Sequence, residues 1–297
     1  KNLYEIIKHM PKKSHPMDVA RTAVSVMGLE DKETQDSSPE ANMRKALRIF
    51  AKTPTALAAF YRIRKGKKII KPKKTLTFAE NFFYMCFGKV PQKEIVKAFD
   101  VSLILYAEHS FNVSTFTART ITSSLSDIHG AITGAIASLK GPLHGGANEE
   151  VMHMMNKIKK PENALKWINN ALKNKEVVMG FGHRVYKSGD SRVPTMRQYF
   201  GKVAKLKKDK KFEKIYDIVE KVMIKEKNIH PNVDYPTGPT YHLMGFDTDF
   251  FTPIFVISRI TGWSAHIMEQ HAANKLIRPL ASYKGSKHRK VLELNQR

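Results

Sequence analysis

Three segments of the sequence each place one ionisable side chain among glycines or prolines. They are residues 141–146 with His144, residues 180–183 with His183, and residues 231–236 with Asp234. Each segment interrupts a helical pattern, and binding residues concentrate on loops that carry ionisable groups. A glycine beside a histidine also lets a ligand or a neighbouring backbone approach closely. A carboxylate and two imidazoles in such positions are suited to acid–base chemistry.

His109 is a further candidate of the same kind. It follows Glu108 at the end of the apolar run 101–107, a position that suits a polar group delivered from a helix terminus into a cleft. Any one histidine is more often a structural residue than a catalyst. These positions therefore carry weight only as a combination.

The spacing of the histidines does not favour a metal site. His230 lies four residues before Asp234 and His266 lies five before His271, and neither pair forms the His-Glu-x-x-His pattern of a zinc helix. A single cysteine in the chain removes most zinc frameworks. Residues 180–182 begin like a dinucleotide fingerprint, but a third glycine and a preceding strand are missing. We therefore expect no metal and no permanently bound cofactor.

Helical periodicity dominates the segments between these loops. Apolar residues at 215, 218, 219, 222 and 223 follow the i, i+3, i+4, i+7, i+8 spacing of an amphipathic helix. Thr77 and Glu80 have the spacing of a capping box, and Pro39 and Pro161 are typical first residues of helices. Alternating strand patterns with hairpin turns are essentially absent from the sequence. The sequence therefore predicts an all-α fold.

Residues 115–139 form a long stretch rich in alanine, serine, glycine and threonine. Small side chains let a partner helix approach closely, so such a helix suits the centre of a core or a helix–helix contact between subunits. We expect a single helix here, with a structural role.

The composition of the 297 residues is ordinary for a globular protein, apart from a net charge of +24. This charge fits either a lysine-rich solvated surface or the binding of a polyanion such as nucleic acid. The lysines are spread through the chain with few aromatic residues between them, which favours the solvated surface. Nucleic-acid binding is kept only as a distant alternative.

The cysteine content and the apolar segments bear on the compartment. The single cysteine, Cys86, lies among aromatic residues and is expected to be a buried hydrophobe, and the lack of a disulfide framework fits a reducing compartment. No stretch reaches the ~20 apolar residues of a membrane helix and no signal peptide is visible, so we expect no membrane association. The chain opens on Lys1 and not on Met, so we expect the native N-terminus to lie outside this sequence. A bacterial protein would be cytoplasmic, and a eukaryotic one would lie in the mitochondrial matrix.

Five segments together resemble the successive active-site motifs of citrate synthases, in that family's order and spacing. They are residues 107–114, 141–148, 180–187, 232–234 and 277–279. The resemblance covers essentially the whole chain, apart from the family's first several dozen residues, which have no counterpart here. It implies condensation of an acyl-CoA with oxaloacetate, followed by hydrolysis of the thioester.

The resemblance also implies roles for the ionisable residues. Asp234 would take a proton from the carbon next to the thioester carbonyl, and a neutral His144 would hydrogen-bond the thioester oxygen and stabilise the enol. His183 would donate to the oxaloacetate ketone as it becomes an alcohol. No metal takes part in these roles.

The substrate-binding residues follow from the same resemblance. Forked guanidinium groups suit the two carboxylates of oxaloacetate. The resemblance assigns this role to Arg192, Arg259 and Arg278, assisted by His109. Arg278 would reach in from a second subunit, so a homodimer is expected. For coenzyme A, the implied contacts are the basic side chain of Lys187 and the backbone of Met179, Gly180 and Gly182.

The architecture implied by the family is a two-domain helical fold with the active site in the cleft between the domains. A large helical domain would comprise residues 1–146 and 246–297, and a small helical domain residues 147–245. Closure of the cleft would shield the reactive enol from water.

Two departures from the common family pattern indicate which acyl group is used. Residues 190–192 read Asp-Ser-Arg where many citrate synthases have Asp-Pro-Arg, and residues 235–239 read Tyr-Pro-Thr-Gly-Pro where many have a Tyr-Ser-Gly-like stretch. Both resemble a branch of 2-methylcitrate synthases, which use propionyl-CoA. One methyl group in an apolar pocket is worth only ~1–3 kcal/mol, so acetyl-CoA is expected as a substrate too. A dedicated citrate synthase is the alternative.

Overall fold

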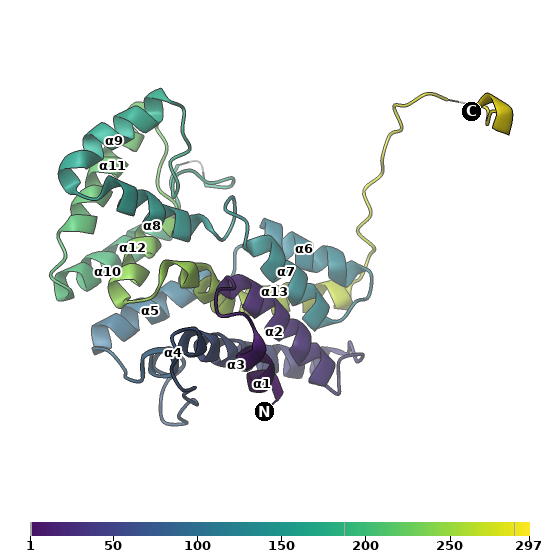
Figure 1. The fold of residues 1–297 in the computed structure, drawn as a ribbon, viewed down its shortest axis with the longest axis horizontal. Helices are drawn as coiled ribbons and strands as arrows, with labels where there is room; N and C mark the ends of the chain where they lie inside the picture. The colour runs from purple at the N-terminus through teal and green to yellow at the C-terminus, as the bar shows by residue number, and fades with distance from the viewer. Residues whose placement is uncertain (1, 187, 288) are drawn as a thin grey trace.

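The computed structural model describes residues 2–186, 188–287 and 289–297 and shows a protein built from helices (Figure 1). In chain order these are α1 (Asn2–His9), α2 (Pro16–Glu30), α3 (Pro39–Arg64), α4 (Phe78–Phe87), α5 (Lys93–Tyr106), α6 (Val113–Ser123), α7 (Ile128–Leu139), α8 (Ala147–Ile158), α9 (Pro161–Lys173), α10 (Val193–Leu206), α11 (Lys211–Lys227), α12 (Asp234–Met244), the 3-10 helix η1 (Thr248–Phe250), α13 (Phe251–Ala272) and the 3-10 helix η2 (Leu294–Gln296). Among the described residues, β structure is confined to an isolated antiparallel bridge between Phe181 and Pro231. The predicted all-α class is confirmed.

The local helix signals in the sequence act as predicted. The Thr77 hydroxyl accepts the Glu80 N–H and the Glu80 carboxylate accepts the Thr77 N–H, so both halves of the capping box open α4. Pro39 is the first residue of α3 and Pro161 the first of α9, where a missing N–H costs nothing. Along α11 the predicted apolar stripe faces the core, with Val219 at its centre.

The prediction of one helix over residues 115–139 is wrong, because the stretch folds into a helical hairpin. α6 ends at Ser123, Leu125 takes a left-handed conformation (φ 66°), and Asp127 opens α7 by accepting two backbone N–H groups. The small residues allow the two antiparallel helices to pack closely. A Cβ added at Gly134 on α7 would lie 2.2 Å from the Ile121 Cδ1 atom on α6.

The helices are arranged in two groups (Figure 1). Helices α8 to α12 lie together at the upper left of the view, and α1 to α7 with α13 form the larger remainder. In the first group α12 packs against α8 and α10, and α11 against α9. In the second, α13 packs against α3, α5, α6 and α7, and its Arg259 and Trp263 side chains are buried. The groups meet where α5 contacts α10 and α12.

The segment after α13 leaves the body of the protein in an extended conformation (Figure 1). Its start is fixed to the end of α6, because the Ile277 N–H donates to Ser123 Oγ at 3.0 Å. Further along, large apolar side chains such as Leu280 and Tyr283 are exposed. A segment of this kind is available for contact with another chain.

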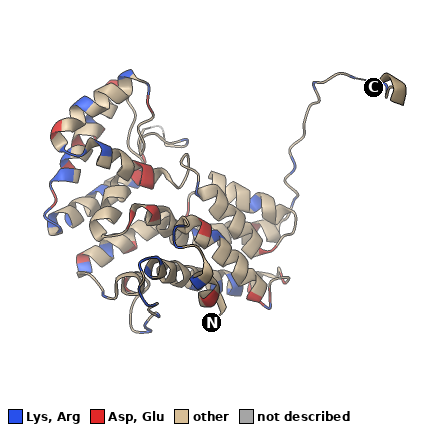
Figure 2. Cartoon of the chain, in the orientation of Figure 1, with Lys and Arg blue, Asp and Glu red and all other residues tan. Residues whose placement is uncertain are grey.

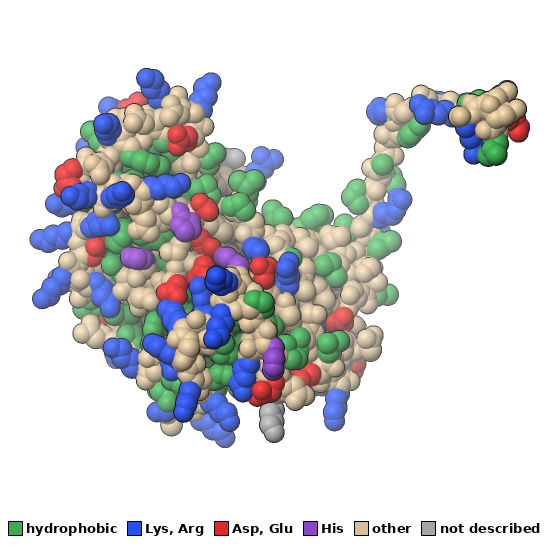
Figure 3. Space-filling view, in the orientation of Figure 1, with side chains coloured by type: hydrophobic (Ala, Val, Ile, Leu, Met, Phe, Trp, Pro, Cys, Tyr) green, Lys and Arg blue, Asp and Glu red, His purple; other side chains and the backbone are tan. Residues whose placement is uncertain are grey.

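Charged side chains cover both helix groups. Lysine and arginine positions are spread along both helix groups in Figure 2, and their side chains are spread over the face that Figure 3 shows, with acidic side chains among them. In the part of the chain that the structure describes, no helix is both long enough and apolar enough to cross a membrane. Cys86 is buried, and burial raises the pKa of its thiol.

Candidate active site

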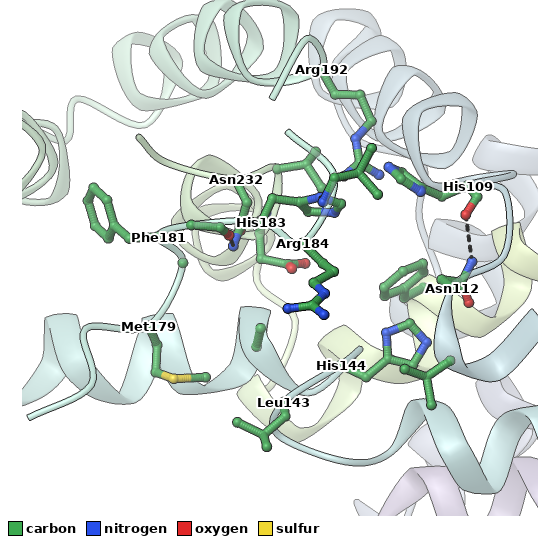
Figure 4. A pocket seen from close by; sticks show the side chains of 18 of the residues that line it. His109, Asn112, Leu143, His144, Met179, Phe181, His183, Arg184, Arg192 and Asn232 are labelled. Atoms are coloured by element: carbon green, nitrogen blue, oxygen red, sulfur yellow. Dashed lines mark hydrogen bonds between the residues drawn. The ribbon is translucent and has the colours of Figure 1, made fainter. Parts of the chain in front are cut away.

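A cavity of about 470 Å³ lies between the two helix groups and gathers most of the residues singled out in the sequence (Figure 4). Its lining includes His109, His144, His183, Asp234, Arg192, Arg259, Met179, Gly180 and Gly182. These residues come from positions up to about 150 apart in the chain, so only folding brings them together. Lys187 lies outside the described residues, and Arg278 lies elsewhere.

The glycine-rich loop is held beside the start of α12 by a short backbone pairing. The Gly182 N–H donates to the His230 carbonyl and the Asn232 N–H donates to the Gly180 carbonyl, both at 2.8 Å. Gly180 has φ 84°, and a Cβ there would lie 2.9 Å from the Tyr235 Cβ atom. Glycine is therefore required at position 180, and the pairing keeps the His183 loop in register with Asp234.

His144 is held in one tautomer. The Ser114 backbone N–H donates to His144 Nε2 at 3.2 Å, and Ser114 Oγ lies 2.8 Å from the same atom. Because a backbone N–H can only donate, Nε2 must accept, and the proton of the neutral ring is on Nδ1. Burial, followed by the charges of Arg259 and His109, lowers the pKa of His144 to about 4. The ring is thus a neutral hydrogen-bond donor at physiological pH.

His183 is oriented by its own loop. The Val185 N–H at 3.0 Å and the Tyr186 N–H at 3.3 Å both donate to His183 Nδ1, so a neutral ring carries its proton on Nε2. The His109 and His183 rings are neighbours, with centroids 4.9 Å apart, and both contact the Tyr186 ring. The loop thus places the His183 ring beside the His109 ring, which comes from the segment after α5.

Asp234 is the first residue of α12 and lines the cavity. The Tyr106 hydroxyl, at the end of α5, donates to Asp234 Oδ1. Burial raises the pKa of Asp234 to about 6, although the Tyr106 hydrogen bond and the charges of Arg192 and Arg259 act to lower it. A carboxylate with such a pKa is a stronger base than an exposed aspartate and is still ionised near neutral pH.

Arg192 is fixed by a neighbouring carboxylate. Its Nε and Nη2 atoms donate to the two oxygens of Asp190 at 2.9 and 2.7 Å, and Asp190 is itself buried and accepts the Val233 N–H at 3.0 Å. This pairing raises the pKa of Arg192 although burial opposes it. The guanidinium is therefore rigid and charged, with its remaining nitrogen available to the cavity.

Arg259 and His109 leave polar atoms buried without a partner. Arg259 donates from Nε to the Tyr106 carbonyl at 2.6 Å, and its guanidinium lies 4.7 Å from the centroid of the Phe255 ring. Among the described residues, Arg259 Nη1 and His109 Nε2 have no hydrogen-bond partner. Burial lowers the pKa of Arg259 to about 10, which keeps it charged at neutral pH. An unsatisfied buried guanidinium nitrogen is costly, so Arg259 Nη1 favours an anionic ligand in the cavity.

The cavity is positive overall. Arg184 also lines it, and its side chain points inward beside His183 and His144 (Figure 4). Three arginines thus face one aspartate in the cavity lining, which suits a dicarboxylate or a phosphate-bearing ligand. Among the described residues, no group of three or more His, Cys, Asp or Glu side chains is placed to hold a metal ion.

Comparison with known proteins agrees with this geometry. A family model described as "Citrate synthase, C-terminal domain" matches residues 1–280. The chain belongs to the citrate synthase family.

Two curated relatives are similar over nearly the whole chain. A protein named citrate synthase from Mycolicibacterium smegmatis is 51% identical over 292 residues, which are 98% of this chain and 78% of that protein. A protein named 2-methylcitrate synthase from Mycobacterium tuberculosis is 52% identical over 289 residues, which are 97% of this chain and 73% of that protein.

A solved citrate synthase from Thermoplasma acidophilum, in a ternary complex with carboxymethyl coenzyme A and oxaloacetate, has the same fold. It matches with a TM-score of 0.92 at 32% identity, over 100% of this chain and 80% of that one. The family membership and the all-α fold therefore rest on sequence and structure alike.

Several residues that shape this cavity escaped the sequence analysis. Tyr106, which holds Asp234, gave no signal, because it looks like the last apolar residue of a helix. Ser114 and Asp190 lie within segments 107–114 and 190–192, but the sequence analysis assigned neither of them a contact. Their action depends on a contact with a side chain or loop elsewhere, which no local pattern reveals.

Proposed function

We propose that this protein condenses an acyl-CoA with oxaloacetate and hydrolyses the resulting thioester. The supporting observation is that one cavity holds Asp234, whose pKa is raised, and the neutral donor His144. The same cavity holds Arg259 and His109, whose Nη1 and Nε2 atoms have no partner among the described residues. A base and a donor serve enolisation, and the unsatisfied Arg259 nitrogen serves a dicarboxylate. The Thermoplasma acidophilum relative, solved with a coenzyme A analogue and oxaloacetate, supports the same ligands.

In the first step Asp234 takes a proton from the acyl carbon next to the thioester carbonyl. The electrons of that C–H bond form the carbon–carbon double bond of the enol, and His144 donates from Nδ1–H to the thioester oxygen. His144 is neutral, so it is a weak acid, as the enol is. A hydrogen bond between two weak acids stabilises the enol without an imidazolium cation in the desolvated site.

In the second step the enol carbon attacks the ketone carbon of oxaloacetate, and His183 donates the proton from Nε2 to the ketone oxygen as it becomes an alcohol. Arg192, Arg259 and His109 hold the two carboxylates during this step, and Arg278 of a second subunit completes the set. Water then adds to the thioester carbonyl, and coenzyme A leaves as the free thiol.

For the acyl group, we infer that propionyl-CoA gives 2-methylcitrate and that acetyl-CoA gives citrate. The relatives at 51% and 52% identity bear different names, so overall identity does not separate the two activities. A Bacillus subtilis relative, 42% identical over 95% of this chain and 76% of its own, is named citrate/2-methylcitrate synthase, which supports dual use. The variant residues 190–192 and 235–239 support propionyl as the preferred group.

For coenzyme A, residues 179–182 line the cavity, and their backbone would face the adenine. Arg184 points into the same space and can supply a phosphate contact in addition to the one expected from Lys187. No metal or resident cofactor is required by this chemistry.

For the assembly, we infer a homodimer and a two-domain subunit. Arg278 is exposed on the segment that follows α13 and is not part of the cavity lining of its own chain, which fits a residue shared across subunits. The separation of α8 to α12 from the other helices supports a large domain of residues 1–146 and 246–297 and a small domain of residues 147–245. Because the named relatives are bacterial, the cytoplasm is the compartment we favour over a mitochondrial matrix.

The test is release of thiol from propionyl-CoA or acetyl-CoA by the full-length protein. Thiol should appear only when oxaloacetate is present, and kcat/KM should be higher for propionyl-CoA. Asp234→Ala should lower kcat by about 10²–10⁴-fold, the range of general-base catalysis, while oxaloacetate still binds. No oxaloacetate-dependent thiol release by the wild type would refute the proposed function.

A further inference from the structure

Tyr106 joins the two helix groups at the reacting end of the cavity. It is the last residue of α5 in one group, and its hydroxyl donates to Asp234 Oδ1 at the start of α12 in the other. The side chain is 1% exposed, so water does not compete for this hydrogen bond. The contact spans 128 positions in the chain.

The Tyr106 side chain has little freedom to move. Its ring packs against Phe255 with centroids 4.0 Å apart, and its backbone carbonyl accepts from Arg259 Nε at 2.6 Å. One residue therefore touches both the base of the proposed reaction and an arginine of the proposed dicarboxylate site. The hydroxyl acts on Asp234, whereas the carbonyl acts on Arg259.

We propose that Tyr106 is a positioning residue for the condensation, holding Asp234 Oδ1 so that Oδ2 receives the proton of the acyl carbon. This inference rests on the proposed function. In the step, the C–H electron pair forms the enol double bond and the proton moves to Oδ2, while Tyr106 keeps its own proton throughout. Without the hydroxyl, the carboxylate can rotate and presents either oxygen at an uncontrolled angle.

The hydrogen bond also sets how readily Asp234 ionises. The charged groups that face this carboxylate are Arg192 and Asp190 at the start of α10 and Arg259 from α13. The titratable phenols coupled to it are Tyr106 from α5 and Tyr241 on α12 itself. Tyr106, Arg192 and Arg259 lower the pKa of Asp234, and burial and Asp190 raise it. Loss of the hydroxyl removes a stabilising interaction of the ionised form, so the carboxylate would need a higher pH to ionise.

The test is the Tyr106→Phe variant, which keeps the ring against Phe255 and the carbonyl against Arg259. Its kcat should fall about 10–100-fold, since a misplaced base loses much of its catalytic effect. The acid limb of kcat/KM should move upward by about half to one pH unit. The KM for oxaloacetate should change less than about threefold, because the Arg259 contact is to the backbone.

Tyr241→Phe is the matched control. The Tyr241 hydroxyl, also buried, lies 2.9 Å from Ser102 Oγ and likewise joins α12 to α5, but away from the cavity. This variant should keep the wild-type acid limb and a kcat within about twofold.

A second substitution covers the case in which Tyr106→Phe does not fold. Tyr106→3-fluorotyrosine keeps the shape of the side chain and makes it a stronger donor, so the acid limb should move to lower pH. Unchanged kcat and an unchanged acid limb in the folded Phe or fluorotyrosine variant would overturn the positioning role. That outcome differs from failure of the proposed function, in which the wild type itself releases no thiol.

Discussion

Replacing Asp234 with asparagine should stabilise the substrate-free protein while abolishing thiol release. Asparagine has nearly the same shape, and its Oδ1 can still accept the Tyr106 hydrogen bond that the structure shows. The only property removed is the negative charge. The prediction therefore isolates the energetic cost of holding an ionised base in this cavity.

The magnitude follows from the pKa of Asp234, which rises from the usual 3.8 to about 6 in the folded protein. Between these values the folded state binds a proton that the unfolded state has already lost, so stability falls as pH rises through this window. The full shift corresponds to roughly 3 kcal/mol at pH 7.5. The cavity admits some water to the carboxylate, so we expect Asp234→Asn to stabilise by about 1–3 kcal/mol.

Urea denaturation at pH 7.5 and at pH 4 provides the assay. Near pH 4 the folded wild type carries a protonated Asp234, so the advantage of the variant should shrink to within about 0.5 kcal/mol. Asp100→Asn on the exposed face of α5 is the control and should change stability by less than about 0.5 kcal/mol at either pH. A variant no more stable than the wild type at pH 7.5, or equally stabilised at both pH values, would contradict the electrostatic account.

Two further predictions concern the dimer and the close approach of α13 to α5. If Arg278 serves the partner's site, the Arg278→Ala and Asp234→Asn proteins should each be inactive but should regain about a quarter of wild-type kcat when unfolded and refolded together in equal amounts. About half of the dimers are then mixed, and each mixed dimer holds one intact site. No recovery of activity in mixed dimers would contradict sharing. Gly262→Ala would place a Cβ 2.6 Å from the Ala107 carbonyl oxygen, close in sequence to His109. We expect denaturation to show a free energy of unfolding lower by about 1–3 kcal/mol and calorimetry to show weaker oxaloacetate binding. Gly201→Ala on α10 meets its nearest atoms at 3.5 Å and should instead be neutral or stabilising.

The fold class could be predicted from local patterns because helix signals act over a few residues. The Thr77–Glu80 capping box and the prolines at positions 39 and 161 begin helices where the sequence places them. The same local view failed for residues 115–139, where composition suggested one helix. Small side chains indicate close packing but do not say whether the neighbour is another chain or the continuation of the same one.

The residue types of the candidate site could also be predicted from the sequence. Five ordered motifs gave the citrate synthase family, and the cavity gathers His144, His183 and Asp234 as the resemblance implied. The roles assigned to these residues stay predictions until turnover is measured. Sequence could supply them because glycine and proline settings and residue order are properties of the chain itself.

Tertiary structure alone decided how the site is tuned. The Tyr106 hydroxyl reaches Asp234, the Ser114 N–H fixes the tautomer of His144, and Arg259 is buried with Nη1 unpaired among the described residues. Each of these facts depends on the distance and burial of groups far apart in the chain, and pKa and hydrogen-bond direction respond to that environment and not to sequence neighbours. The sequence thus determined which groups the protein has for chemistry, and packing determined their charge, their protonation and where they point.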